Sequence, residues 1–208
     1  VLTHTSGLTL NPRGRGLTEA QIAKVTNDGK GWPTLAERVA HAAMIPAAFH
    51  PGDEWQYGDS TDYVAVLVEK ISGQSIDRFL GERIFEPLGM GNTHFSDNHL
   101  EIVPGRAESY APEDEGGYRR VLNQLTALAS SSLNTSIDDF LVWMKNYETG
   151  QIGGEETLER MLVQGVLNDG EVLSYAYGLA RGEYRGLPTF GHGGSWAGFR
   201  TNFVRFPE

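Results

Sequence analysis

Near its C-terminal end the chain carries the stretch Phe190-Gly191-His192-Gly193-Gly194-Ser195-Trp196-Ala197-Gly198-Phe199, in which four glycines surround one histidine. Glycine has no Cβ atom, so another group can approach the backbone of such a stretch closely. Residues on both sides of it are β-like in composition. We therefore expect this stretch to form strand backbone beside a binding site, and the rest of the chain is interpreted around it.

Three segments near this stretch have the pattern of β-strands. They cover residues 174–182, 187–192 and 199–206, and two of the three alternate between apolar and polar side chains. Alternation with a period of two is typical of strands that bury one face. The sequence predicts two or three antiparallel strands here.

The first two thirds of the chain have helical patterns instead. Capping residues followed by apolar residues at helical spacing predict six helices, at 18–25, 34–44, 60–72, from 75 to a stop at 87–89, from 136 through 144, and 155–163. Thr34 with Glu37, and Ser136 with Asp139, have the three-residue spacing of a capping box. Gly73 is the expected end of the third helix.

Helices first and strands last indicate an α+β fold rather than repeated βαβ units. We expect a mainly helical lobe with site loops at 1–165 and antiparallel strands of a central sheet at 166–208, in one interdependent domain that is incomplete at both ends. Residues 97–120 are rich in proline, glycine and charged side chains. They predict a long exposed connection, of the kind that often borders a binding site.

Composition excludes several classes of function. The 208 residues carry 27 acidic and 17 basic side chains, a formal net charge of -10, and no cysteine. This charge argues against a nucleic-acid or anionic-membrane partner, and disulfides and thiolate chemistry are excluded. No window approaches the roughly 18 apolar residues that a transmembrane helix needs, so we predict no membrane span.

The histidines and glycines also lack the common cofactor patterns. Five histidines outside the opening stretch show neither metal-ligand spacing nor a His-Glu-x-x-His pattern: His4, His41, His50, His94 and His99. There is no glycine-rich phosphate-binding loop and no Gly-x-Ser-x-Gly elbow. We therefore expect neither a metal nor a cofactor.

Four segments, in this order, resemble the serine β-lactamase-like superfamily. They are Leu2-Thr3-His4-Thr5-Ser6-Gly7-Leu8, Pro51-Gly52-Asp53-Glu54-Trp55-Gln56-Tyr57-Gly58-Asp59, Ile84-Phe85-Glu86-Pro87-Leu88-Gly89-Met90 and Gly191-His192-Gly193-Gly194. The branch they resemble contains class C β-lactamases, D-alanyl-D-alanine carboxypeptidases and family VIII esterases. The resemblance implies the β-lactamase/transpeptidase-like fold, seen here as a helical lobe with part of the antiparallel sheet.

The family's Tyr-x-Asn motif falls on Tyr57-Gly58-Asp59. The resemblance makes Tyr57 the catalytic base, a role that needs nearby positive charge because a phenol titrates near 10 in water. The alternative is that Tyr57 simply forms part of an amphipathic wall. Asp59 replaces an asparagine, and an ionised carboxylate only accepts hydrogen bonds. Asp59 therefore orients substrate, pairs with a site lysine, or only begins the helix before Ser60.

His192-Gly193-Gly194 occupies the place of the family's Lys-Thr-Gly motif. The resemblance implies that these three residues and Trp196 contact substrate. It also implies that the amide of Ser195 is one donor of an oxyanion hole, typically worth about 3 kcal/mol of transition-state stabilisation.

The family's nucleophile lies in a Ser-x-x-Lys motif, which these residues lack. The four lysines follow, at a distance of three, residues other than serine: Gln21 before Lys24, Asn27 before Lys30, Leu67 before Lys70 and Val142 before Lys145. Ser130-Ser131-Ser132 lacks an activating lysine and reads as a loop. We expect the serine and lysine upstream of Val1, and further strands beyond Glu208.

The resulting expectation is a serine hydrolase that works through an acyl-enzyme. Short carboxylic esters are favoured, because Asp59 and His192 replace groups that lactamases use. β-Lactams and D-amino-acid peptides remain alternatives within the enzyme class. A catalytically inactive binding or scaffold protein with the same fold is the alternative from another class.

Overall fold

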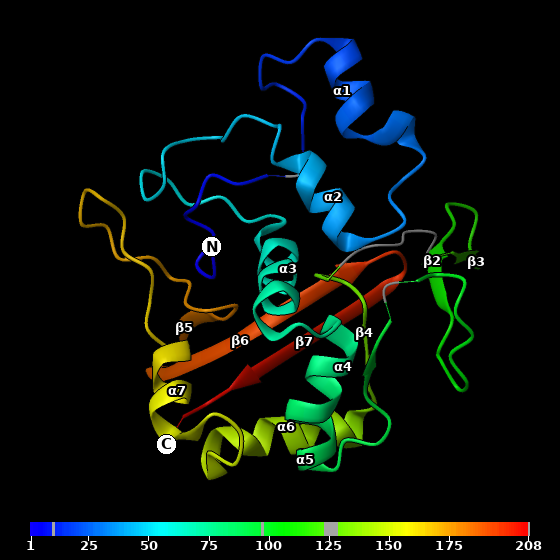
Figure 1. Ribbon diagram of the computed structural model, residues 1–208. Helices are drawn as coiled ribbons and strands as arrows, with labels where there is room; N and C mark the ends of the chain where they lie inside the picture. The colour runs from blue at the N-terminus through cyan, green and yellow to red at the C-terminus, as the bar shows by residue number, and fades with distance from the viewer. Residues whose placement is uncertain (10, 97, 123–128, 208) are drawn as a thin grey trace.

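The computed structural model describes residues 1–9, 11–96, 98–122 and 129–207, and these residues contain seven α-helices, a short 3-10 helix η1 (Asn27–Gly29), one π-helical stretch and seven strands. The α-helices are α1 (Glu19–Val25), α2 (Leu35–Ala42), α3 (Ser60–Ser72), α4 (Ile76–Leu80), α5 (Glu86–Leu88), α6 (Ile137–Thr149) and α7 (Gly154–Met161). The strands are β1 (His94–Phe95), β2 (Ser109–Pro112), β3 (Tyr118–Val121), β4 (Leu133–Asn134), β5 (Ala180–Tyr184), β6 (Leu187–Trp196) and β7 (Phe199–Arg205). Figure 1 shows this order, and the predicted α+β class is confirmed.

The predicted caps start three of the helices. The side chain of Thr18 accepts a hydrogen bond from the amide of Gln21, whose own side chain closes the capping box. Thr34 accepts from the amide of Glu37 at the start of α2, and Ser136 accepts from the amide of Asp139 at the start of α6. Each contact satisfies one amide that the first turn of a helix leaves without a partner.

The single helix predicted from residue 75 is interrupted. After α4 the backbone widens into one π-helical stretch, η2 (Gly81–Phe85), before α5, and Gly89 then ends the run in the left-handed region with φ 73°. Pro87 lies inside α5, near its first turn, where a missing amide proton costs little. The predicted stop at 87–89 is therefore found, but the regular helix before it is not.

The main sheet has the order β5-β6-β7, and both pairs are antiparallel. Helix α6 packs against it: the Phe140 and Phe203 rings lie 5.4 Å apart, and Tyr147 lies 5.1 Å from Phe190. Arg205 of β7 adds a hydrogen bond of 2.6 Å to the carbonyl oxygen of Met144. Figure 1 shows α6 running along the lower edge of the two long strands.

The predicted strand limits were wrong at two places. Strand β5 begins only at Ala180, because the chain turns at Gly178 with φ 71° while Tyr175, Ala176 and Leu179 are buried around that turn. Burial of three near neighbours imitates the alternation of a strand in the sequence. Strand β6 continues to residue 196, beyond the predicted limit of 192, because its glycines pair in register with β7.

The expected exposed connection at 97–120 contains a β-hairpin. Residue 97 lies outside the described residues. Strands β2 and β3 pair from Ser109 with Val121 to Pro112 with Tyr118. Most of their side chains are exposed, which explains why the sequence shows no alternation. The hairpin touches the turn between β6 and β7, where a Cβ atom on Gly198 would collide with the backbone of Tyr110.

Helix α3 forms the centre of the helical part. Two small apolar clusters meet along it: Leu35, Ala65, Val66, Ile76 and Phe95 form one, and Val25, Ala42, Ile45 and Tyr63 form the other. Asp62 is fully buried between them, pairs with Arg38 at 2.8 Å and accepts the amides of Ala129 and Ser130. This carboxylate therefore fixes the loop before β4 against α3.

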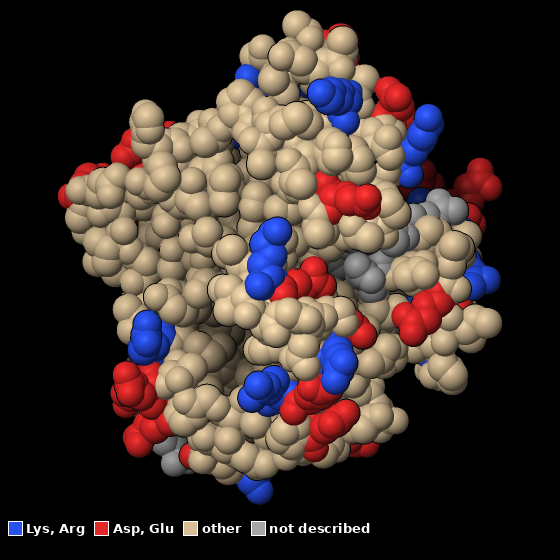
Figure 2. All heavy atoms as spheres, viewed as in Figure 1, with Lys and Arg blue, Asp and Glu red and all other residues tan. Residues whose placement is uncertain are grey.

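Charged side chains occur in small groups of both signs on the face shown in Figure 2. Among the described residues, no helix is both long and apolar enough to cross a lipid bilayer.

Candidate active site

Two distant segments pair to form the base of the candidate site. Residues 2–8 and 48–58 are joined by three backbone hydrogen bonds of 2.8 to 3.0 Å, namely Ala48 to Gly7, Gly52 to Thr5 and Gln56 to His4. Gly7 has φ 71°, and a Cβ atom there would collide with the carbonyl oxygen of Phe49. The glycine of this motif is therefore required by a close backbone approach.

A third segment, residues 163–179, closes against the first two. The amide of Asn168 donates to the carbonyl of Gly52 at 2.8 Å, and its side chain donates to Asp53 at 2.8 Å. The amide of Gly178 donates to the carbonyl of Leu2 at 3.3 Å. These bonds bring Tyr175, just before the sheet, next to the residues around Tyr57.

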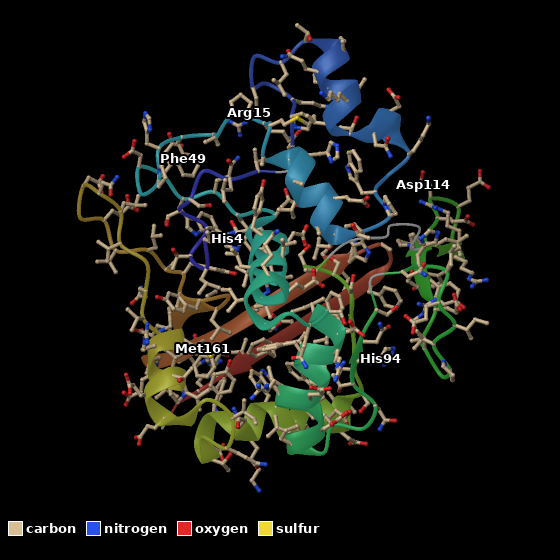
Figure 3. The ribbon with its side chains drawn as sticks, in the orientation of Figure 1. His4, Arg15, Phe49, His94, Asp114 and Met161 are labelled. Atoms are coloured by element: carbon tan, nitrogen blue, oxygen red, sulfur yellow. The ribbon has the colours of Figure 1, made fainter. Side chains whose placement is uncertain are left out.

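Five rings meet where these segments reach β6, and we call them the aromatic cluster: His4, Trp55, Tyr57, Tyr175 and His192. Neighbouring ring centroids lie between 4.5 and 6.4 Å apart, within the range of favourable aromatic contact. Figure 3 places His4 beside the N-terminal end of α3. The cluster has a buried side, with His4 and Tyr175, and an exposed side, with Trp55 and Tyr57.

Two phenols share one nitrogen of His192. The Tyr57 hydroxyl oxygen lies 3.3 Å from Nε2, and the Tyr175 hydroxyl oxygen lies 3.1 Å from the same atom. An unprotonated Nε2 has one lone pair and accepts one hydrogen bond along it. Only one phenol at a time can donate to it, so the other remains available for a different partner.

Burial raises the pKa of both phenols. The pKa of Tyr57 lies above its ordinary value of 10.0 because of burial, and burial followed by the charge of Tyr57 raises the pKa of Tyr175 to about 12. Both side chains therefore keep their protons at neutral pH. Tyr175 can donate to His192 in the tautomer that leaves Nε2 unprotonated, whereas Tyr57 needs an adjacent cation before it can act as a base.

Asp59 lies at the N-cap position of α3, so it does begin the helix, but its side chain makes no capping hydrogen bond. Burial lowers the pKa of His4 overall, and the Asp59 charge opposes that shift, which places the carboxylate near the aromatic cluster. Substrate contact and pairing with a lysine stay predictions for Asp59.

The remaining predicted residues follow His192 along β6. Strand β5 pairs with β6 only as far as Gly191, opposite Ala180, whereas β7 pairs from Phe190 to Trp196. Among the described strands, residues 192–195 therefore pair with β7 on one side and with no strand on the other. Gly193, Gly194 and Ser195 are exposed along this edge, and Trp196 ends it. Tyr57 and His192 are in direct contact, whereas Ser195 and Trp196 lie further along the strand.

Three members of the cluster were not predicted as site residues: His4, Trp55 and Tyr175. His4 and Trp55 lie in the two motifs quoted for the resemblance, so their place in those motifs was an available signal. Tyr175 had no such signal, because its contact with His192 depends on the turn at Gly178.

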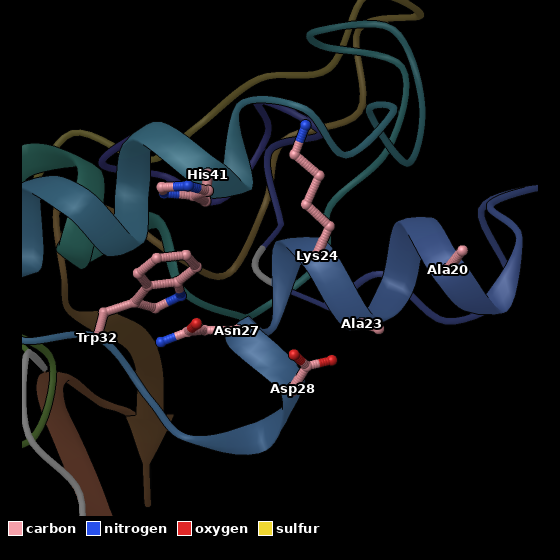
Figure 4. Close-up of a pocket in the computed structure, with 7 residues that line it drawn as sticks. All are labelled: Ala20, Ala23, Lys24, Asn27, Asp28, Trp32 and His41. Carbon is pink, nitrogen blue, oxygen red and sulfur yellow. The ribbon is translucent and has the colours of Figure 1, made fainter.

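Two hollows lie at different places in the described structure. A small one of about 120 Å³ borders the aromatic cluster and is lined by Val1, Leu2, His4, Thr61, Val64, Tyr177 and Gly178. A wider one of about 570 Å³, the α1–α2 cleft, is lined by Ala20, Ala23, Lys24, Asn27, Asp28, Trp32 and His41 (Figure 4). Within the described ranges, no group of three or more acidic or histidine side chains is arranged to hold a metal ion.

The protein family described as beta-lactamase matches residues 1–208. This chain belongs to the beta-lactamase family. Similar curated proteins are a D-aminopeptidase of Gluconobacter oxydans, 24% identical over 155 residues, and a lovastatin esterase of Penicillium rubens, 30% identical over 118 residues. These matches cover 74% and 56% of this chain, but only 29% and 28% of those proteins.

Solved structures agree with the fold. The octameric penicillin-binding protein homologue from Pyrococcus abyssi has a TM-score of 0.76 and 25% identity, and the match covers 99% of this chain and 48% of that chain. The penicillin-binding protein of Bacillus halodurans has a TM-score of 0.77 and 18% identity, with 99% and 62% covered. The chain thus spans less than a third of the curated relatives named above, which are hydrolases by name, and about half to three fifths of the two solved structures.

Proposed function

We propose that this beta-lactamase-family chain forms part of a serine hydrolase that cleaves small carboxylic esters through an acyl-enzyme intermediate. The observation that carries the proposal is the contact between Tyr57 and His192, at 3.3 Å, beside the open edge of β6. The nucleophilic serine and its lysine would come from sequence outside these 208 residues. The similarity to an esterase and to D-aminopeptidases supports acyl transfer as the reaction class.

In this mechanism Tyr57 first accepts a proton and then donates it. As a phenolate held by the lysine ammonium, it accepts the proton of the serine hydroxyl while the serine oxygen bonds to the acyl carbon. It then gives that proton to the departing alkoxide as the ester C–O bond breaks. In the second half of the reaction, a water molecule gives a proton to Tyr57 as its oxygen bonds to the acyl carbon. Tyr57 then returns that proton to the serine oxygen, and the acid is released.

His192 and the strand edge would orient the acyl group. Tyr175, with its pKa near 12, keeps its proton and occupies Nε2 of His192, so Tyr57 is left to face the nucleophile. The Ser195 amide would face the developing oxyanion. Gly193 would let the substrate approach the strand, since a Cβ atom there meets nothing closer than 3.8 Å.

The second candidate substrate class is amides of D-amino acids. The D-aminopeptidase match covers 74% of this chain, more than the 56% covered by the esterase match. An amide nitrogen must be protonated before it leaves, and the proton held by Tyr57 serves this step equally well. Esters remain our first proposal because Asp59 offers no amide donor to a lactam or peptide carbonyl.

The decisive experiment compares the native protein with the Tyr57→Phe variant. We expect a fluorophosphonate to label one serine, and p-nitrophenyl butyrate to be hydrolysed faster than a chromogenic cephalosporin or D-alanine p-nitroanilide. Loss of the phenol proton carrier should lower kcat/KM by roughly 10² to 10⁴. Tyr118→Phe, which changes an exposed tyrosine of the hairpin, is the matched control and should be active.

Each other outcome identifies a different function. A protein that takes no label and turns over none of the three substrates would be an inactive binding protein. Preferred turnover of the cephalosporin or of the anilide would replace the ester assignment by a lactamase or D-peptidase assignment. Full activity of Tyr57→Phe would remove Tyr57 from the mechanism.

A further inference from the structure

His4 occupies a constrained position next to Tyr57. Its side chain is 5% exposed, and its backbone has φ 56°, in the left-handed region that non-glycine residues rarely adopt. Its own amide donates to the carbonyl of Val1 at 3.0 Å. Left-handed backbone at a buried non-glycine residue costs free energy, and it persists where surrounding contacts over-determine it.

The contacts of His4 enclose Tyr57 from both sides along the chain. The carbonyl oxygen of His4 accepts the amide of Gln56 at 3.0 Å, and its Nδ1 accepts the amide of Gly58 at 3.3 Å. Between these two bonds, the Tyr57 ring lies 4.5 Å from the His4 ring, tilted by 39°. One residue thus holds the residue before Tyr57, the residue after it, and its ring.

We propose that His4 is a positioning residue that keeps the Tyr57 phenol within reach of His192, and that it does so only while its imidazole is neutral. The role of Tyr57 in catalysis rests on the proposed function. The contacts between His4 and residues 56–58 do not depend on that proposal. His4 acts through the backbone of residues 56 and 58. It is given no contact with substrate and no step in proton transfer.

The charge state of Nδ1 decides whether the bond to Gly58 exists. An unprotonated Nδ1 accepts the amide proton, whereas a protonated Nδ1 carries a hydrogen of its own and faces the amide as a second donor. Protonation therefore replaces an attraction by a repulsion one residue from Tyr57. Since a displacement of about 1 Å can cost roughly 10²-fold in rate, loss of this bond should be visible in kcat/KM.

The surroundings of His4 favour the neutral form. Burial is the largest cause that lowers its pKa below 6.5, and His192 from β6 acts in the same direction. The carboxylate of Asp59 acts in the opposite direction. Tyr57 and Tyr175 also face the ring, but both are uncharged at neutral pH.

The pH dependence follows from this sign. A histidine whose folded-state pKa is depressed contributes stability above its unfolded pKa of about 6.5, and that contribution is lost as pH falls through the lower folded-state value. We therefore expect the bond between Gly58 and His4 to be intact at pH 7 and above. It should open only as pH falls through the folded-state pKa of His4, which lies below 6.5, and Tyr57 should then lose its position.

Two substitutions of His4 separate the effect of its hydrogen-bond acceptor from the effect of its ring. In His4→Asn, the side-chain oxygen can take the place of Nδ1, the charge is absent at every pH, and asparagine tolerates a positive φ. In His4→Phe the ring remains and the acceptor is lost. His41→Asn is the matched control, because His41 lies in the α1–α2 cleft.

The primary measurement is the ¹⁵N–¹H signal of Gly58 between pH 5 and 8 in the native protein. We expect it to move with the titration of the His4 ring, to stay constant in His4→Asn, and to move normally in His41→Asn. In activity, His4→Asn should stay within about threefold of the native protein and lose the His4-dependent fall in acid, whereas His4→Phe should lose 10- to 100-fold.

The inference would be overturned if the Gly58 signal did not change while His4 titrates, or if the His4→Phe variant were fully active. The signal is read in the unmodified protein, so the test does not depend on the folding of a variant. If Gly58 follows His4 but the native protein hydrolyses nothing, the proposed function fails while the positioning contact stands.

Discussion

The aromatic cluster and the α1–α2 cleft both bring a histidine against a larger ring, but they differ in how they are held. In the cleft, Trp32 stacks on His41 with centroids 3.8 Å apart, and all lining residues come from one stretch of the chain, 20–41. In the aromatic cluster, the rings come from four separate segments linked by hydrogen bonds. The larger hollow is therefore formed by residues close together in sequence, and it does not lie where the predicted site residues Tyr57 and His192 meet.

Among the variants that test this comparison, we expect the largest changes in stability and activity from substitutions of the glycines in β6. A Cβ atom on Gly191 would collide with the carbonyl oxygen of Phe203, so Gly191→Ala should lower the free energy of unfolding by about 1 to 3 kcal/mol. Gly193→Ala, with open space around it, should leave stability unchanged and lower kcat/KM. Urea unfolding and steady-state kinetics on both variants check this contrast.

Equal stability of the two glycine variants would show that the close pairing of β6 with β7 does not fix this strand. Unchanged kinetics in Gly193→Ala would show that the substrate does not approach the open edge.

A smaller effect is expected from Tyr175→Phe, which removes one hydroxyl and keeps the ring. The lost bond to His192 is worth about 0.5 to 1.5 kcal/mol, so kcat/KM should fall between about twofold and tenfold. The pKa of Tyr175 is raised to about 12 in the folded protein, so its protonated side chain contributes to the free energy of unfolding fully below pH 10. This contribution is lost as pH rises through 12. The variant should lack that alkaline loss.

Urea unfolding at pH 9 and at pH 11 measures this second part directly. The stability gap between native protein and Tyr175→Phe should narrow at the higher pH. A gap that widens would mean that Tyr175 ionises more easily in the folded protein than in the unfolded chain.

The smallest effect on activity should come from the cleft. Trp32→Ala removes the ring that stacks on His41, and we expect a loss of about 1 kcal/mol in stability with kcat/KM unchanged. Denaturation and kinetics on the same preparation test this. A fall in kcat/KM comparable to that of Tyr175→Phe would join the cleft to the active site and end the distinction between the two regions.

Local signals predicted the fold best. The caps at Thr18, Thr34 and Ser136 depend on side chains three residues apart, so the sequence contains everything that they need. The hairpin β2–β3 escaped prediction because exposed strands bury too little to alternate. The late start of β5 escaped because a buried turn and a strand can share the same pattern.

The candidate site was predictable only in part for the same reason. Tyr57 and His192 fall on motifs that a family resemblance identifies, and they lie in contact. Tyr175 reaches His192 only because Gly178 reverses the chain and Leu2 accepts its amide, a contact between residues far apart in sequence. Local sequence patterns do not predict such a contact, because the contact forms only in the assembled fold.

The open edge of β6 also carries a hazard for the protein itself. A strand with unpaired amides and carbonyls can recruit a strand of another molecule, which leads to aggregation. Among the described strands, the edge of β6 that no second strand pairs is only residues 192–195 long, and two of these residues are glycines, which form strands poorly. Residues that admit a ligand to this edge would thus also make it a weak template for association, so catalytic access and solubility would be selected at the same positions.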